Sequence, residues 1–230
     1  MSQTALNLVA ISIFVLTLST LLGPLFNLSS AVPALAAFTL LGLATLDTLS
    51  WRGQGGTLLL DWLASISPKH RERVIHHEAG HFLVAYVLGI PVTSYTLTAW
   101  EAFRQGQPGL GGVTFDTQSL ETQATGNQAL LTPLLEKYFT VWMAGAVAET
   151  LVYGKAEGGA DDRNKFRLLW SQLRRPSVEG EQKERWATQQ SKQLLQQNWP
   201  AYEALVHALE QRASIAECYQ LLDQHCGQNY

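Results

Sequence analysis

Residues 67–89 read SPKHRERVIHHEAGHFLVAYVLG, and this stretch decides the fold of the domain around it. Ser67 followed by Pro68 is a helix start signal, because serine caps an N-terminus and proline fits the first helical position. Apolar residues then recur at helical spacing from Val74 to Tyr86, and Gly89 marks the end. The sequence therefore predicts one helix that begins at Pro68 and stops before Gly89.

Three polar residues lie within this helix at a spacing that metal chemistry uses. His77 and His81 are four residues apart, about 400° around a helix, so both imidazoles lie on one face. Glu78 is turned about 100° away, where it can address a water on the same metal but is poorly placed as a ligand. Zinc-dependent peptide hydrolysis needs such a set: zinc lowers the pKa of water, and Glu78 takes the proton. The alternative is a polar helix face that happens to hold two histidines.

A hydrolytic zinc site needs a third protein ligand and an open fourth position. His70 lies two turns before His77, roughly 10 Å along the axis, which is too far to share the metal. His76 is turned away from that face, and we expect both to be exposed. Asp161 and Asp162 are better candidates because they follow a glycine turn at a helix start, where N-capping without a metal is the alternative. From the residues alone these two are nearly tied. Other residues considered are His207 and His225, which lack a partner pattern, and the carboxylates of Glu149 and Glu157.

The N-terminal stretch differs in composition from the rest of the chain. No charged side chain occurs before Asp47, and two apolar runs, Leu8–Phe26 and Ala31–Leu46, flank a short polar turn. Their lengths predict a transmembrane helical hairpin over residues 1–50. The alternatives are a cleaved signal peptide, which the lack of Lys or Arg before Leu8 disfavours, and a buried helical hairpin in a soluble core.

Basic residues predict the orientation of this hairpin. Its turn has none, whereas Arg52 and then Lys69, Arg71 and Arg73 follow the second run. The positive-inside rule therefore predicts a multi-pass integral membrane protein with two helices and its C-terminal domain on the cytoplasmic side, or the stromal side in a plastid. Residues 51–66 are expected to form a linker, whose second half is either an interfacial helix or core packing.

Beyond residue 89 the chain is predicted to be helical with a small β-hairpin. Pro91–Trp100 predicts a strand from its β-branched and aromatic residues, and Val113–Phe115 can return as a second strand after a glycine-rich turn. Helices are expected over residues 129–153, after the break at 157–162, and over 181–198, 200–212 and 213–225. The predicted fold is thus mainly α, with a transmembrane hairpin (1–50), a linker (51–66) and a helical zincin-type peptidase domain (67–230).

Charge and cysteine content exclude other classes of protein. The net charge of −3 argues against nucleic acid as a partner, since phosphate binding needs a basic surface. Cys218 and Cys226 are too few for a disulfide framework and lack the closer spacing and further ligands of a structural zinc site. We expect ordinary thiols of a reducing compartment.

Two further motifs, taken with the metal helix, resemble one known family. Met143–Gly154 reads MAGAVAETLVYG and Gly158–Asp162 reads GGADD. Their order and spacing after His-Glu-Ala-Gly-His are similar to those in the peptidase domain of FtsH-type zinc metallopeptidases, which are membrane-anchored and ATP-dependent. The similarity covers roughly residues 68–225.

The resemblance implies a role for particular residues. It implies zinc ligation by His77, His81 and Asp162, since Asp161 stands where the family has Asn, and it gives Glu78 the role of general base. Glu149 matches the glutamate of the family's Ala-Glu pair. It is expected either to support a ligand or to be a structural helix carboxylate.

The chain also departs from that family. The segment between Trp51 and Ser67 has no room for the AAA ATPase module, and the sequence contains no Walker A pattern. Ala146 stands where the family commonly has Arg, and Thr150 where a second Glu is common. Residues 77–92 are also similar to the metal helix of site-2 intramembrane proteases, but the charged residues 69–73 directly before it disfavour that interpretation.

Taken together, the sequence predicts a membrane-anchored, ATP-independent zinc metalloendopeptidase that acts on unstructured or partner-delivered proteins. The expected partners are a protein or peptide substrate, the membrane, and either further copies of the chain or FtsH-type ATPase subunits. Neither nucleic acid nor ATP is expected to bind. The alternative from another class is a catalytically silent membrane subunit or scaffold, in which Glu78 would have no use.

Overall fold

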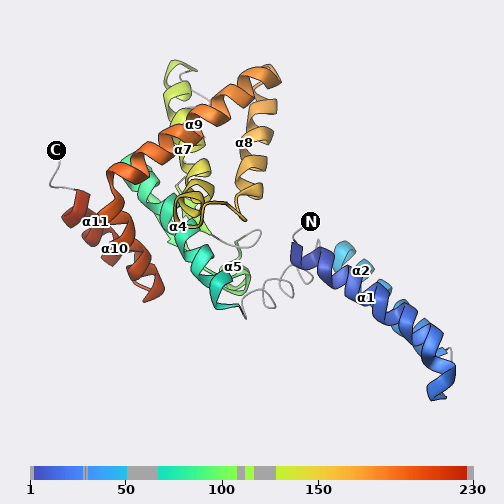
Figure 1. Ribbon diagram of the computed structural model, residues 1–230. Coiled ribbons are helices and arrows are strands. Elements are labelled where there is room, and N and C mark those ends of the chain that lie inside the picture. The colour runs from blue at the N-terminus through green and yellow to red at the C-terminus, as the bar shows by residue number, and fades with distance from the viewer. Residues whose placement is uncertain are drawn as a thin grey trace. The chain divides into compact units, whose positions relative to one another are not determined.

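The computed structural model of the protein describes residues 3–27, 29, 31–50, 67–107, 112–116 and 128–226. Over these residues the chain is mainly helical with one small two-stranded sheet, as predicted (Figure 1). It divides into two compact units, Met1–Ser67 with Thr98–Gly111, and Pro68–Leu97 with Gly112–Tyr230. The predicted linker over residues 51–66 lies outside the described residues.

The first unit is built from helices. α1 (Gln3–Leu22) leads into a 3-10 turn, η1 (Gly23–Phe26), and is followed by α2 (Ala31–Ser50) and the short α5 (Ala99–Arg104). Hydroxyl groups within α1 and α2 donate to carbonyls one turn earlier in the same helix, as Thr17 does to Ile13 at 2.8 Å. The helix itself therefore satisfies these polar side chains.

The predicted transmembrane hairpin is wrong. Among the described residues, no helix is both long enough and apolar enough to cross a bilayer. The run Leu8–Phe26 is not one α-helix, because α1 ends at Leu22 and η1 follows. The second run ends at Leu46, where α2 continues through Asp47. The prediction of an integral membrane protein with two helices and a cytoplasmic domain is therefore wrong as well.

The second unit is centred on α4 (Pro68–Val87) and α7 (Gln128–Tyr153), which pack along each other. A Cβ on Gly80 would lie 2.7 Å from the Cβ of Ala148 and 2.8 Å from the carbonyl oxygen of Ala144. Only glycine allows the two helices to approach this closely. The approach accounts for a residue that costs about 1 kcal/mol in a helix interior, and it brings α7 against the histidines of α4.

The sheet is shorter than the sequence predicts. β1 (Val92–Tyr95) pairs antiparallel with β2 (Val113–Phe115), with a register irregularity between Val92 and Ser94. The predicted strand continued to Trp100, but the hydroxyl of Thr98 accepts a hydrogen bond from the backbone N–H of Glu101 at 3.2 Å and caps α5. A local side-chain cap thus ends the extended conformation that the β-branched residues favour.

The remaining helices cover α4 and α7. α8 (Ala160–Gln172) and α9 (Ser177–Gln197) pack on α7, and α10 (Trp199–Glu210) and α11 (Ile215–Cys226) pack on α4. Tyr219 of α11 accepts a hydrogen bond from the backbone N–H of Val92 at 2.8 Å, which connects α11 to β1. Cys218 and Cys226 are free and buried, so they pack as small apolar side chains.

Candidate metal centre

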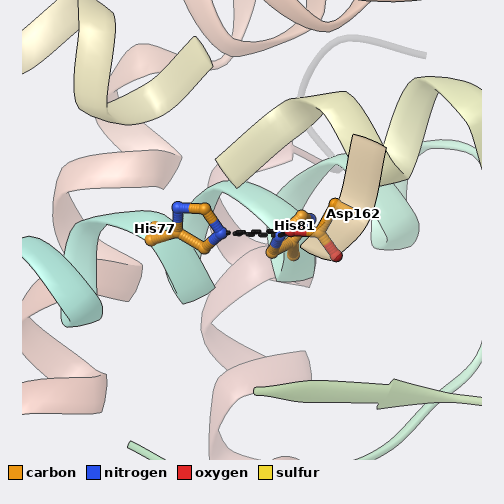
Figure 2. A group of neighbouring side chains, drawn as sticks. All are labelled: His77, His81 and Asp162. Atoms are coloured by element: carbon orange, nitrogen blue, oxygen red, sulfur yellow. Dashed lines mark hydrogen bonds and ion pairs between the residues drawn. The ribbon is translucent and has the colours of Figure 1, made fainter. Parts of the chain in front are cut away.

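The two histidines of α4 face the same point, as their spacing predicts. His77 and His81 are 9% and 5% exposed, and their Nε2 atoms lie 3.1 Å apart (Figure 2). Their rings meet edge to face with centroids 4.7 Å apart. The α-helix alone provides this arrangement, since residues four apart lie one above the other.

The third group comes from the first turn of α8. Asp162 is buried, and its Oδ2 lies 3.4 Å from Nε2 of His77 and 3.3 Å from Nε2 of His81. Asp161 is exposed, so the structure brings only one member of this pair to the histidines. Gly159 precedes the helix with φ of 85°, a backbone conformation that glycine adopts without strain. His77, His81 and Asp162 form a buried group that could hold a metal ion.

Hydrogen bonds from each imidazole to α7 determine which of its ring nitrogens faces this group. Nδ1 of His81 lies 2.7 Å from the carbonyl oxygen of Val141, which can only accept, so Nδ1 carries the proton. Nδ1 of His77 lies 2.7 Å from Oε1 of Glu149 and donates to that carboxylate in the same way. Both Nε2 atoms therefore direct lone pairs toward Oδ2 of Asp162. A single proton cannot bridge all three atoms at once, whereas all three can bind one metal ion.

The carboxylates around the histidines favour positive charge at this centre. Burial raises the pKa of Glu149, but hydrogen bonds from His77 and from the backbone N–H of Glu157 lower it to about 2. Burial lowers the pKa of His77, but hydrogen bonds with Asp162 and Glu149 raise it to about 10. The pKa of Asp162 is well below its usual range, because the charge of His81 and the hydrogen bonds of both histidines outweigh its burial. The centre thus strongly attracts positive charge.

Glu149 of α7 connects two of the three groups. Besides His77, its carboxylate accepts the backbone N–H groups of Glu157 at 2.9 Å and Gly158 at 3.1 Å, in the turn that leads to Asp162. Arg73 completes the set with Nη1 3.1 Å from Oε2 of Glu149. One carboxylate therefore orients His77 and anchors the segment that carries Asp162.

Sequence reasoning missed Arg73, although a signal was present. Arg73 lies one turn before His77 on the same helix, and its guanidinium stacks over Tyr153 with its carbon 4.3 Å from the ring centroid. It also donates to the carbonyl oxygen of Lys155 at 3.2 Å. An i, i+4 spacing to a metal-binding histidine would have placed Arg73 on the same face.

Two glycines leave room for the histidines. A Cβ on Gly145 of α7 would clash with Nε2 of both His77 and His81. A Cβ on Gly158 would lie 2.6 Å from Oε1 of Glu149 and 3.0 Å from Nδ1 of His77. The geometry of the site therefore requires glycine at both positions, and each of the two motifs that resemble the FtsH family contains one of them.

Glu78 lies on another side of α4, toward the sheet. It is 8% exposed, and its Oε2 accepts the backbone N–H of Val113 at 2.8 Å. Gly112 precedes β2 with φ of 125°, and a Cβ there would lie 3.1 Å from Oε2 of Glu78. The start of β2 thus holds the carboxylate in one orientation, separate from the hydrogen bonds that fix the histidines.

The other sequence candidates lie away from this group. His70 and His76 were expected to be exposed, but both are half-buried, and Nδ1 of His76 lies 2.8 Å from the hydroxyl of Tyr202. Burial lowers the pKa of His76. His207 lies 3.3 Å from Glu210, and Glu157 is 56% exposed at its side chain, where it pairs with Arg73. None of these belongs to the three-residue group of the described chain.

Neither a protein-family model nor a curated protein sequence matches this chain. The resemblance to FtsH-type peptidases therefore stays a prediction from the motifs.

Proposed function

We propose that this protein is a zinc metalloendopeptidase that works without ATP hydrolysis of its own. One observation carries the proposal: two imidazole Nε2 atoms and Oδ2 of Asp162 converge in a buried site, and a fixed glutamate follows the first histidine on the same helix. Holding a metal ion requires only the first part of this arrangement. The second part, Glu78, is the feature that hydrolysis adds.

The donor set fits zinc. Two neutral imidazoles and one carboxylate leave a further coordination position open, as hydrolytic zinc sites do. When bound, zinc would supply a Lewis acid that acidifies water and polarises a peptide carbonyl. Magnesium and calcium favour sites made of oxygen ligands, and the two nitrogen donors here disfavour both ions.

Each polar group then has a definite task. Glu78 accepts the proton of the attacking water on its carboxylate and later delivers it to the leaving amine. The N–H of Val113 holds Oε2 of Glu78 and so fixes the plane of the carboxylate. Glu149 keeps the proton of His77 on Nδ1, which leaves Nε2 available as a ligand.

The proposed substrates are unstructured or partner-delivered polypeptides, because the sequence has no Walker A pattern with which to drive unfolding. Association with FtsH-type ATPase subunits, or with further copies of the chain, is a proposal that follows from the motif resemblance.

Comparison of the wild type with Glu78→Gln tests the proposal. The measurements are zinc content by mass spectrometry and cleavage of a denatured, fluorescently labelled protein. We expect about one zinc per chain in both proteins and at least about a thousandfold lower cleavage in the variant, because a general base and its proton transfers are lost. Zinc binding without Glu78-dependent cleavage would leave a structural metal site, as in the silent-subunit alternative.

A further inference from the structure

A cavity lies in the same unit as the metal centre and is lined by other residues. It has a volume of about 360 Å³ and is lined by residues of α7, α8 and α9 and of the turn between α8 and α9. Phe139 lies six residues before Gly145 on α7, roughly 9 Å along the axis, and Trp170 lies eight residues after Asp162 on α8, roughly 12 Å. The volume is in the range of small-molecule sites.

The floor of this cavity is apolar and well packed. Leu135, Phe139 and Trp170 are 8%, 2% and 7% exposed and belong to one buried cluster. The indole N–H of Trp170 donates to the carbonyl oxygen of Pro176 at 3.0 Å, so the polar atom of the ring has a partner within the fold. The floor therefore offers aromatic and aliphatic surface and selects an apolar group.

The rim of the cavity carries two cationic side chains and one carboxylate. Lys183 pairs with Glu136 at 2.5 Å, which neutralises one of the two cations that line the cavity. The other, Arg175, has its guanidinium carbon 5.8 Å from the centroid of Trp170. In the described part of the chain Arg175 contacts this ring rather than a carboxylate. One positive charge at the rim is thus left over.

The backbone conformation at the end of α8 positions the guanidinium of Arg175. Arg174 has φ of 54° and ends α8 in the left-handed region, which residues other than glycine adopt rarely. Its backbone N–H donates to the carbonyl oxygen of Ser171 at 3.0 Å. The turn therefore sets Arg175 next to Trp170, at the edge of the apolar floor.

We propose that this cavity binds a carboxylate attached to an aromatic or aliphatic group. The apolar group lies on Phe139 and Trp170, and Arg175 pairs with the carboxylate, whose geometry suits a guanidinium. Two sources share this chemistry, a small organic acid and the C-terminal residue of a peptide. The inference does not depend on peptidase activity.

Titration calorimetry on the full chain tests the proposal with four probes. These are 4-phenylbutyrate and the uncharged 4-phenylbutanol, and a tetrapeptide that ends in phenylalanine as the free acid and as the amide. We expect saturable binding of at least one acid and an affinity at least about tenfold weaker for its uncharged counterpart, as the loss of a charge-assisted hydrogen bond requires. Binding of the butyrate identifies a small-acid site, and binding of the peptide acid alone identifies a C-terminus site.

Two variants separate charge from cavity. Arg175→Gln should weaken binding of the acid about tenfold and leave that of the uncharged probe within about twofold. Leu135→Trp should fill the floor and abolish binding of both. The far-UV circular dichroism spectrum of both variants should equal that of the wild type, which serves as the control for folding. No saturable binding of either acid, or an equal loss for acid and uncharged probe in Arg175→Gln, would overturn the proposal.

Discussion

Two sides of helix α4 hold their side chains by different means. On the metal side, His77 and His81 donate hydrogen bonds to acceptors on α7, and Asp162 of α8 lies against both rings. On the strand side, Glu78 is held by one backbone N–H of β2. The candidate metal-binding group and Glu78 are thus held by separate parts of the fold. Substitutions on the metal side should therefore lower zinc affinity, whereas those on the strand side should lower kcat and leave zinc affinity unchanged.

The largest effect is expected from removing the ligand that comes from α8. Asp162→Ala should lower zinc affinity by at least about a thousandfold, because the site keeps only two imidazoles in a buried space. Peptide cleavage should be lost together with the metal. The measurement is a competitive zinc titration with a chromophoric chelator.

Asp161→Ala is the matched control, since this neighbouring carboxylate is exposed. It should leave zinc affinity and cleavage unchanged within about twofold. An equal loss in both variants would mean that α8 does not present Asp162 as described.

A smaller effect is expected from the group that orients His77. Glu149→Gln keeps the size of the side chain but weakens the hydrogen bonds that fix Nδ1 of His77 and the turn at Gly158. We expect zinc affinity to fall about 10- to 100-fold, as for other residues that support metal-binding histidines. Cleavage measured at saturating zinc should fall much less.

Glu157→Gln serves for comparison, because Glu157 also contacts Arg73 but is largely exposed. Its zinc affinity should stay within about twofold of the wild type, as exposed ion pairs contribute little. If both variants bind zinc like the wild type, Glu149 has only a structural role in the helix.

The smallest effect should appear on the strand side. Gly112→Ala introduces a Cβ at a φ of 125°, 3.1 Å from Oε2 of Glu78. The carboxylate has to shift, so we expect kcat to fall about tenfold while zinc affinity is unchanged.

Gly106→Ala is the matched control for backbone strain, since Gly106 also has a positive φ, of 68°, but no atom of the described residues lies within 4 Å of a Cβ built there. This variant should lose some stability and keep kcat. A loss of zinc from Gly112→Ala would show that the two sides of α4 are not independent.

Much of the centre could be predicted because helical periodicity is local. Ser67-Pro68 and the apolar spacing give α4, and four residues between histidines are enough to place both rings on one face. Asp162 could not be separated from Asp161 by spacing, because the choice depends on how the turn at Gly159 directs α8. The motif resemblance favoured Asp162, and its burial against both histidines agrees.

Other expectations failed where local signals compete. The β-branched residues after Pro91 favoured a strand as far as Trp100, but the cap at Thr98 starts α5 instead. The N-terminal runs were read as spans from composition, whereas α1 ends at Leu22 and no described helix meets the requirements of a span. The contact of Val113 with Glu78 joins residues 35 positions apart, which no local pattern reveals.

X-ray absorption spectroscopy at the zinc edge identifies the ligand atoms on the metal and so tests whether His77, His81 and Asp162 bind zinc. We predict one zinc per chain bound by two imidazole nitrogens and a carboxylate oxygen at about 2.0–2.2 Å, with a spectrum that changes in Asp162→Ala and not in Asp161→Ala. A sulfur shell at about 2.3 Å would place the metal on Cys218 or Cys226, and this result, or a chain that binds no zinc, would contradict the account.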